Sequence, residues 1–406
     1  MNYRDGLLRL MAITLAAMPL AHAESQAGGN PWPALQIKGF GTVGIARSDD
    51  ADAEFVRDLS QPDGLGKHWS GKVDSMLGLQ ANLTLNARTA AVIQGIARYR
   101  YDGSWRPELN WAFLRHDLTP DFTVRLGRMG TEFYMQADSR MVGYANLAVR
   151  PSADYFGPIV VSFFDGIDAS MTTDTGAGLL RGKVFAGWAG EKTPFVKPYT
   201  WDLRGSRMFG GHLDYINGPW QFRIGRSQIR FKHQQPLNEA ARQAGFPIDI
   251  LAAAPELSIV GRHGTYDSLG FAYDEGRLQV QGQISHIRYD TSAYEDTTSG
   301  YLIAAYRIGQ TTPYLGYSRT RSSSARLSTP MPPLIAAGIR DFIDQTHADQ
   351  ATVSLGARWD FMQNMALKAQ LDMIRGERDS RFPMRNANRD WDGRMNLFSL
   401  ALDFIF

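Results

Sequence analysis

The chain has 406 residues, and its net charge of +2 is too balanced to indicate nucleic acid or an anionic membrane surface as a general partner. Any electrostatic function must therefore be local. The sequence contains no Cys, which excludes disulfides, thiolate zinc sites and cysteine nucleophiles.

The N-terminal residues predict an export signal. Two arginines precede an apolar stretch over 10–18, and Ala23 ends a small-residue cleavage pattern. The stretch is too short to span a membrane as a helix, and no run of about twenty apolar residues follows it. We therefore expect 1–23 to be a cleaved signal peptide and 24–406 to be the mature domain.

Alternation of apolar and polar residues predicts strands along the whole mature chain. In the clearest example, 74–86, Leu77, Leu79 and Leu83 alternate with polar side chains. In several strands the charged residues occupy only one of the two alternating sets of positions, and so only one face of the strand. This indicates a barrel whose other face meets lipid, because Arg or Lys at mid-bilayer costs about 2 to 4 kcal/mol. A soluble β protein with ordinary packing aromatics is the alternative interpretation. The pattern gives about sixteen strands, over 36–47, 74–86, 90–101, 108–118, 121–129, 158–170, 178–190, 203–215, 219–231, 264–274, 276–289, 299–308, 312–322, 349–360, 364–376 and 395–406.

The predicted connections alternate in length. Short turns such as 217–219 and 274–276 separate longer connectors such as 130–157 and 232–262. Short turns on one rim and long loops on the other are typical of an outer-membrane barrel. The predicted fold class is all-β, a transmembrane antiparallel β-barrel with short periplasmic turns and long extracellular loops.

The last predicted strand carries one unbroken apolar row and ends on an aromatic residue. Such a strand would leave an aggregation-prone edge unless another strand paired with it, and 36–47 is the expected partner. It resembles the terminal strand of Gram-negative outer-membrane barrels, and this resemblance implies that Phe406 is an assembly signal read by the barrel assembly machinery. The row consists of Phe398, Leu400, Leu402, Phe404 and Phe406.

The whole mature chain resembles the trimeric, sixteen-stranded general porins of Gram-negative bacteria. The resemblance rests on the strand plan and on three short motifs, at 39–44, 74–80 and 122–128. It implies a homotrimer in the outer membrane, surrounded by lipid, with the third long loop folded into the lumen. Here that loop is 130–157.

The candidate constriction has a loop side and a wall side. The loop carries Glu132, Asp138 and Asp154 beside basic residues, a mixed charge that leaves ion selectivity open. On the wall, Arg98, Arg100 and Arg125 fall on polar strand faces, and the resemblance adds Arg128 at a strand end. Facing charges of opposite sign would create a transverse field across the pore. The alternative is that these arginines pair with nearby carboxylates.

Other functional classes lack support in the sequence. The glycine pattern at 39–44 lies inside a strand with no helix after it, which argues against a dinucleotide site. The scattered His residues predict no metal site, and we expect no cofactor. A barrel hydrolase is disfavoured because Gly-x-Ser-x-Gly is absent. The predicted function is passive diffusion of small hydrophilic solutes and ions, and the alternative is a substrate-specific channel or an adhesion barrel with a narrow or plugged lumen.

Overall fold

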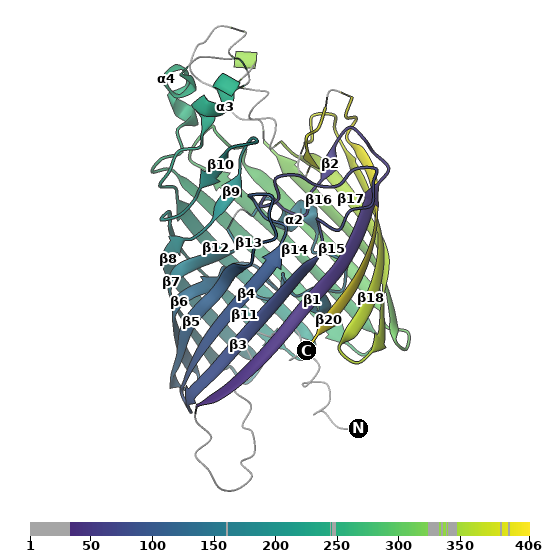
Figure 1. Ribbon diagram of the computed structural model, residues 1–406. Coiled ribbons are helices and arrows are strands. Elements are labelled where there is room, and N and C mark those ends of the chain that lie inside the picture. Colours follow the sequence, from purple (N-terminus) through teal and green to yellow (C-terminus); the bar gives the residue numbers. More distant parts are fainter. Residues whose placement is uncertain are drawn as a thin grey trace.

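Sixteen strands close into one antiparallel barrel within the described residues (Figure 1). The computed structural model describes 33–406 apart from 160, 244, 246–248, 324–332, 334–335, 338, 340–346, 382–383 and 389, so the predicted signal peptide lies outside the described residues. The strand pattern predicted from sequence is confirmed. The wall consists of β1 Ala34–Ser48, β3 Met76–Asn86, β4 Thr89–Arg98, β5 Glu108–Thr119, β6 Phe122–Gly130, β7 Phe163–Asp174, β8 Leu179–Ala189, β11 Arg207–Asn217, β12 Trp220–Arg230, β13 His263–Glu275, β14 Leu278–Tyr289, β15 Thr297–Tyr306, β16 Thr311–Ser322, β17 Asp349–Met362, β18 Met365–Gly376 and β20 Arg394–Ile405.

Alternate side chains along each strand face opposite sides of the wall. On β3, Leu77 and Leu79 are 46% and 51% exposed on the outer face. On β4, Gln94 is buried in the lumen and donates to Gln80 of β3 at 2.8 Å. This is the apolar-out, polar-in rule of a membrane barrel.

The barrel closes between the first and last strands. β1 pairs with β20 from Phe40 opposite Ile405 to Ser48 opposite Leu397. Backbone hydrogen bonds of 2.8 and 2.9 Å join Gly39 to Phe406 in both directions. The Phe406 ring fills the space that a Cβ at position 39 would need, so a larger residue there would displace the ring. The predicted pairing of the terminal strand is confirmed, and its free edge is removed.

The two rims of the barrel differ. Tight turns such as Asn217 to Trp220 join strands at one rim, whereas long connections gather at the other, here called the long-loop rim (Figure 1). Short elements that the strand pattern did not predict pack there. These are the sheet of β2 Glu54–Phe55 with β19 Met384–Arg385, the sheet of β9 Lys192–Pro194 with β10 Thr200–Asp202, the helices α3 Leu237–Gln243 and α4 Ile250–Ala253, and the 3-10 turn Pro255–Leu257.

None of the helices in the described residues is long and apolar enough to cross a membrane.

Candidate functional site

The connection from β6 to β7, residues 131–162, folds into the lumen and is here called the lumen loop. It contains the 3-10 turn Gly143–Ala145 and the helix α2 Ala153–Phe156, which contacts β15, β16 and β17 (Figure 1). The backbone N–H of Met135 donates to Gln283 Oε1 on β14 at 3.0 Å. The N–H of Val149 donates to Gln370 Oε1 on β18, also at 3.0 Å. The predicted inward path of the third long loop is confirmed.

Glu132 ties the start of the lumen loop to two wall strands. Arg125 of β6 donates to Glu132 Oε1 at 2.7 Å, and Lys183 of β8 donates to Oε2 at 2.5 Å. Burial alone would raise the pKa of Glu132, but the charges of Lys183 and Arg125 hold it well below its usual range. Arg125 also donates to Asp168 of β7 at 3.0 Å. Glu132 of the loop and Asp168 of the wall therefore balance the charges of Arg125 and Lys183 together.

Lys368 of β18 holds the middle of the lumen loop. Its Nζ donates to the carbonyl oxygens of Gly143 and Asn146 at 2.8 and 2.6 Å. The same ammonium pairs with Asp403 of β20 at 2.8 Å, and both side chains are fully buried. A Cβ at position 143 would collide with the Asp403 carboxylate, so glycine permits the close approach. The loop backbone thus satisfies a buried wall cation.

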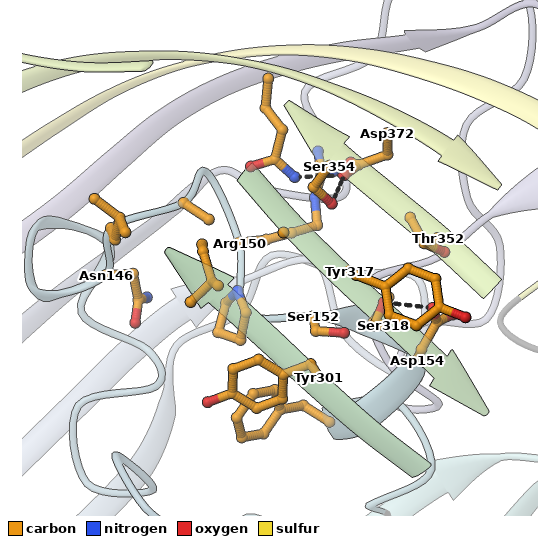
Figure 2. A pocket seen from close by; sticks show the side chains of 18 of the residues that line it. Asn146, Arg150, Ser152, Asp154, Tyr301, Tyr317, Ser318, Thr352, Ser354 and Asp372 are labelled. Carbon is orange, nitrogen blue, oxygen red and sulfur yellow. Dashed lines mark hydrogen bonds and ion pairs between the residues drawn. The ribbon is translucent and has the colours of Figure 1, made fainter. Parts of the chain in front are cut away.

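Arg150 anchors the return of the lumen loop to three parts of the barrel. It donates to Asp74, just before β3, at 2.8 and 2.6 Å. It also donates to Asp372 of β18 at 2.8 Å (Figure 2), and to Ser399 of β20. The guanidinium is almost fully buried, and its fork geometry suits two carboxylates at once. This part of the loop is fixed rather than free to swing.

A small pocket of about 80 Å³ lies between the lumen loop and the strands β14 to β18. Asp154 lies at one side of it and accepts a hydrogen bond from Ser318 at 2.6 Å (Figure 2). It also accepts one from Gln350 at 2.6 Å. Burial raises the pKa of the Asp154 carboxyl. This carboxyl contacts neutral wall groups, so it does not face the predicted basic row.

Aromatic side chains join the lumen loop to the wall. Phe133 packs on Tyr266 of β13 with ring centroids 4.9 Å apart, and Tyr155 shares a hydrogen bond of 2.9 Å with the same tyrosine hydroxyl. Trp111 and Phe113 of β5 belong to the same buried cluster. The cluster therefore fills part of the lumen beside the loop.

The structure separates the predicted wall arginines. Arg98 reaches Ser60 at 2.8 Å in the connection between β1 and β3. Arg100 lies beyond the end of β4, 3.6 Å from Glu108. Arg128 shares the parity of the outward-facing Leu126 and pairs at 2.7 Å with Asp165. Only Arg125 meets a predicted loop acid.

Asp138 is the predicted loop acid with the least engaged carboxylate. It is half-buried, and burial together with the negative charge of Glu132 raises its pKa. The positive charges of Arg223 and Lys183 act in the opposite direction. Asp138 therefore belongs to the same charged region as Glu132.

Several site residues were not singled out from the sequence. They are lumen-facing charges on strands far from the loop in sequence, and their parity was the signal that could have identified them. They are Lys183, Arg223, Arg358, Lys368, Asp372 and Asp403, together with Arg150 of the loop.

The sequence matches the family model of the Gram-negative porins over residues 10–379. The chain belongs to the Gram-negative porin family. The porin is therefore an outer-membrane channel protein of Gram-negative bacteria and not an enzyme. Comparison with curated proteins finds no match.

Solved porin structures share the fold. The anion-selective porin from Comamonas acidovorans is 16% identical with a TM-score of 0.54, and the alignment covers 92% of this chain and 99% of that one. OmpF of Salmonella typhi, in complex with daunomycin, is 12% identical with a TM-score of 0.57, covering 92% and 98%. The outer membrane channel DcaP of Acinetobacter baumannii is 12% identical with a TM-score of 0.56, covering 92% and 97%.

Proposed function

We propose that this porin lets small hydrophilic solutes and ions diffuse passively across the outer membrane, through a lumen narrowed by the lumen loop. The observation that carries the proposal is the fixed position of that loop, held by buried contacts with Lys368 and by the ion pairs of Arg150. A loop held in this way sets a permanent cross-section. Passive conduction needs no moving lid.

Polar side chains on β3 to β5 offer a hydrophilic surface to the solute. Gln80 donates to Asn82 at 2.9 Å, and Gln94 accepts from Asn110 at 3.3 Å. These neutral groups can exchange hydrogen bonds with water or with a passing solute. They support passage of uncharged hydrophilic molecules as well as ions.

The ion selectivity follows from the loop and wall charges in this proposal. Glu132 and Asp138 provide the negative side, and Lys183 and Arg223 provide the positive side. The pairing of Glu132 with Arg125 and Lys183 removes much of the field that these groups would otherwise create. We expect weak rather than strong ion selectivity.

A narrow, substrate-specific channel is the second candidate. It is favoured by the aromatic cluster, in which Tyr134, Tyr155 and Phe156 of the loop pack with Tyr266 and Tyr301 of the wall. Such packing reduces the open area of the lumen. Aromatic faces also suit a flat organic solute.

Single-channel recording in planar bilayers tests the proposal. A passive porin gives an open-channel conductance that rises in proportion to salt concentration, and neutral sugars do not block it at low concentration. Block by micromolar amounts of one solute would favour the second candidate. A reconstituted, folded protein that conducts no ions would contradict both.

We propose that the porin is a homotrimer that associates through the outer face of β1, β3 and β4. This face is apolar and carries the small residues Ala81 and Ala97, which allow close approach of a second copy. One solved neighbour, OmpT of Vibrio cholerae, is described in a trimer form.

An Ala97→Arg variant should lose the trimer band on unboiled gels, whereas Ala186→Arg on the outer face of β8 should keep it. A trimer band in both variants would place the interface elsewhere.

A further inference from the structure

The pocket between the lumen loop and the strands β14 to β18 carries more negative than positive charge. Its charged lining residues are Arg150, Asp154 and Asp372. Arg150 is already engaged, because it pairs with Asp372 at 2.8 Å and with Asp74 at 2.6 Å. Within the described residues, the hydrogen-bond partners of Asp154 are neutral, and no lysine or arginine forms an ion pair with it. The pocket therefore contains one carboxyl group without a counter-ion.

The Asp154 carboxylate can accept a further hydrogen bond. Ser318 and Gln350 each donate to it at 2.6 Å, and the Thr352 hydroxyl bonds the same group. A carboxylate has about four acceptor sites, so at least one stays open. The Ser152 Oγ, which also lines the pocket, is buried and has no hydrogen-bond partner in the part of the chain that the structure describes. Two oxygen groups that can accept from a ligand therefore line this pocket (Figure 2).

Much of the remaining lining is apolar. Phe156, Tyr301, Ile303 and Ile374 contribute to it, and the rings of Phe156 and Tyr301 have centroids 5.6 Å apart. Aromatic faces attract cations, and an apolar wall suits a ligand that carries carbon as well as charge. A metal ion fits less well, because it prefers several charged oxygen ligands. No group of three or more His, Asp or Glu among the described residues could hold one.

The pocket volume of about 80 Å³ limits the size of the ligand. A cavity of about 150 Å³ holds a benzene ring, so this pocket has room for about three non-hydrogen atoms. A short alkylammonium ion such as ethylammonium has this size. Gln136 and Gln281 also line the pocket and are only half-buried, which leaves it reachable by solvent.

We propose that this pocket binds small alkylammonium ions, with Asp154 and the Ser152 Oγ accepting hydrogen bonds from the ammonium group and Tyr301 contacting its carbon atoms. The bound cation balances the carboxylate that no wall cation reaches. Ligands of about three non-hydrogen atoms reach at best about millimolar affinity, so the site fills only at millimolar amine concentrations. The inference concerns binding beside the loop and is independent of the proposed conduction.

Saturation-transfer NMR on the folded barrel in dodecyl maltoside micelles tests this site. The probes are ethylammonium and its neutral counterpart ethanol, with potassium chloride as a competitor. We expect saturable transfer to ethylammonium, with a dissociation constant in the millimolar range, and none to ethanol. Asp154→Asn keeps the shape of the side chain but removes its charge, so it should weaken ethylammonium binding about thirtyfold.

The matched control is Asp117→Asn, which removes a carboxylate on β5. Asp117 lies outside the pocket and pairs with Arg115 at 3.0 Å. This variant should bind ethylammonium as the wild type does.

Gly316→Ala tests the size of the pocket without changing its charge. Gly316 lines the pocket, and its added Cβ would lie 3.4 Å from the Ser354 side chain, an ordinary contact that the fold should tolerate. The methyl group should weaken binding of ethylammonium about fourfold more than binding of methylammonium. This variant decides the question if Asp154→Asn does not give the folded band on unboiled gels.

Equal ethylammonium binding by the wild type and Asp154→Asn, or an equal loss in Asp117→Asn, would overturn the proposal. Complete displacement of ethylammonium by an equal concentration of potassium would identify a site for bare ions. Saturable transfer to ethanol would identify a site for neutral solutes, and no saturable signal from any probe would mean that the pocket holds only water. Each of these three results would overturn the alkylammonium assignment.

Discussion

Glu132 shows how one side chain can decide both the position and the charge of the lumen loop. It accepts from Arg125 and Lys183, which lie on different strands. Removing one member of a buried ion pair leaves the partners uncompensated, at a cost of about 3 to 5 kcal/mol. The same removal adds positive charge to the lumen.

Glu132→Gln should shift the reversal potential in a potassium chloride gradient towards anions. The reason is that Lys183 loses its carboxylate partner while Arg125 keeps Asp168. Measurement in planar bilayers gives the shift directly. The control is Glu239→Gln, which removes the same charge from an exposed position on α3. An equal shift in both variants would show that Glu132 does not act within the pore.

Glu191, at the long-loop rim, should make the stability of the folded protein depend on pH. This buried residue accepts from the Ser162 N–H at 2.9 Å, and burial together with Glu108 raises its pKa from 4.5 to about 8. The folded protein therefore binds this proton more tightly than the unfolded chain does. Protonated Glu191 therefore stabilises the folded protein. This stabilisation is fully present below about pH 4.5 and is lost as pH rises towards about 8.

A Glu191→Gln variant should unfold at nearly the same temperature as the wild type at pH 4.5, and at a higher temperature than the wild type at pH 9. The amide cannot ionise, so it avoids the cost of a buried charge at high pH. Tryptophan fluorescence during heating provides the two midpoints. A constant difference across this pH range would exclude Glu191 as the group responsible.

At the scale of elements, Lys368 holds the middle of the lumen loop to the wall. The ammonium bonds three loop carbonyl oxygens, of Gly143, Asn146 and Ala148, and pairs with Asp403. These contacts join the loop to β18 and β20. The loop is therefore part of the barrel interior rather than an attachment to it.

Lys368→Met should release the middle of the loop and leave Asp403 buried without its cation, at a cost of about 3 to 5 kcal/mol. We expect faster hydrogen exchange over 143–148 and noisier single-channel currents. Adding Asp403→Asn should recover much of the stability without fixing the loop again. Unchanged exchange in the single variant would show that Arg358 and Arg150 hold the loop without Lys368.

The strands could be predicted from the sequence because alternation is a local property of the chain. The residues that anchor the lumen loop could not be predicted from the sequence. Arg150 and its partner Asp372 are separated by 222 residues, and they meet only in the folded barrel. Arg128 illustrates the limit of resemblance. Its motif suggested the constriction, yet its side chain has the same parity as Leu126 and lies on the outer face.

At the scale of the whole molecule, Phe406 extends the ladder between β1 and β20 that closes the barrel. Phe406 bonds the backbone of Gly39 and places its ring over that glycine. Deletion of Phe406 should slow assembly, since it removes the last rung of the ladder between β1 and β20. Conductance of the barrels that do fold should stay unchanged. The rate at which the heat-modifiable band appears on gels measures the effect.

A Gly39→Ala change supplies an independent test of the same contact, because its Cβ would collide with the Phe406 ring. Gly182→Ala on β8 is the matched control, since the nearest side-chain atom to its Cβ is 3.8 Å away. Slow assembly in the first variant alone would support the role of the ring. Equal rates in both would indicate that the terminal carboxylate or backbone, and not the ring, is what matters.

The anchoring of the lumen loop also has a consequence for the order of events during biogenesis. The loop is synthesised before two thirds of the wall, yet Lys368 and Asp403 lie on two of the last three wall strands. We expect the nascent barrel to pass through a stage in which the loop is already present but still unattached. Limited proteolysis of chains truncated before β18 should cleave within 143–148, a segment that the full-length protein protects. The channel would then acquire its final width only when the last strands arrive.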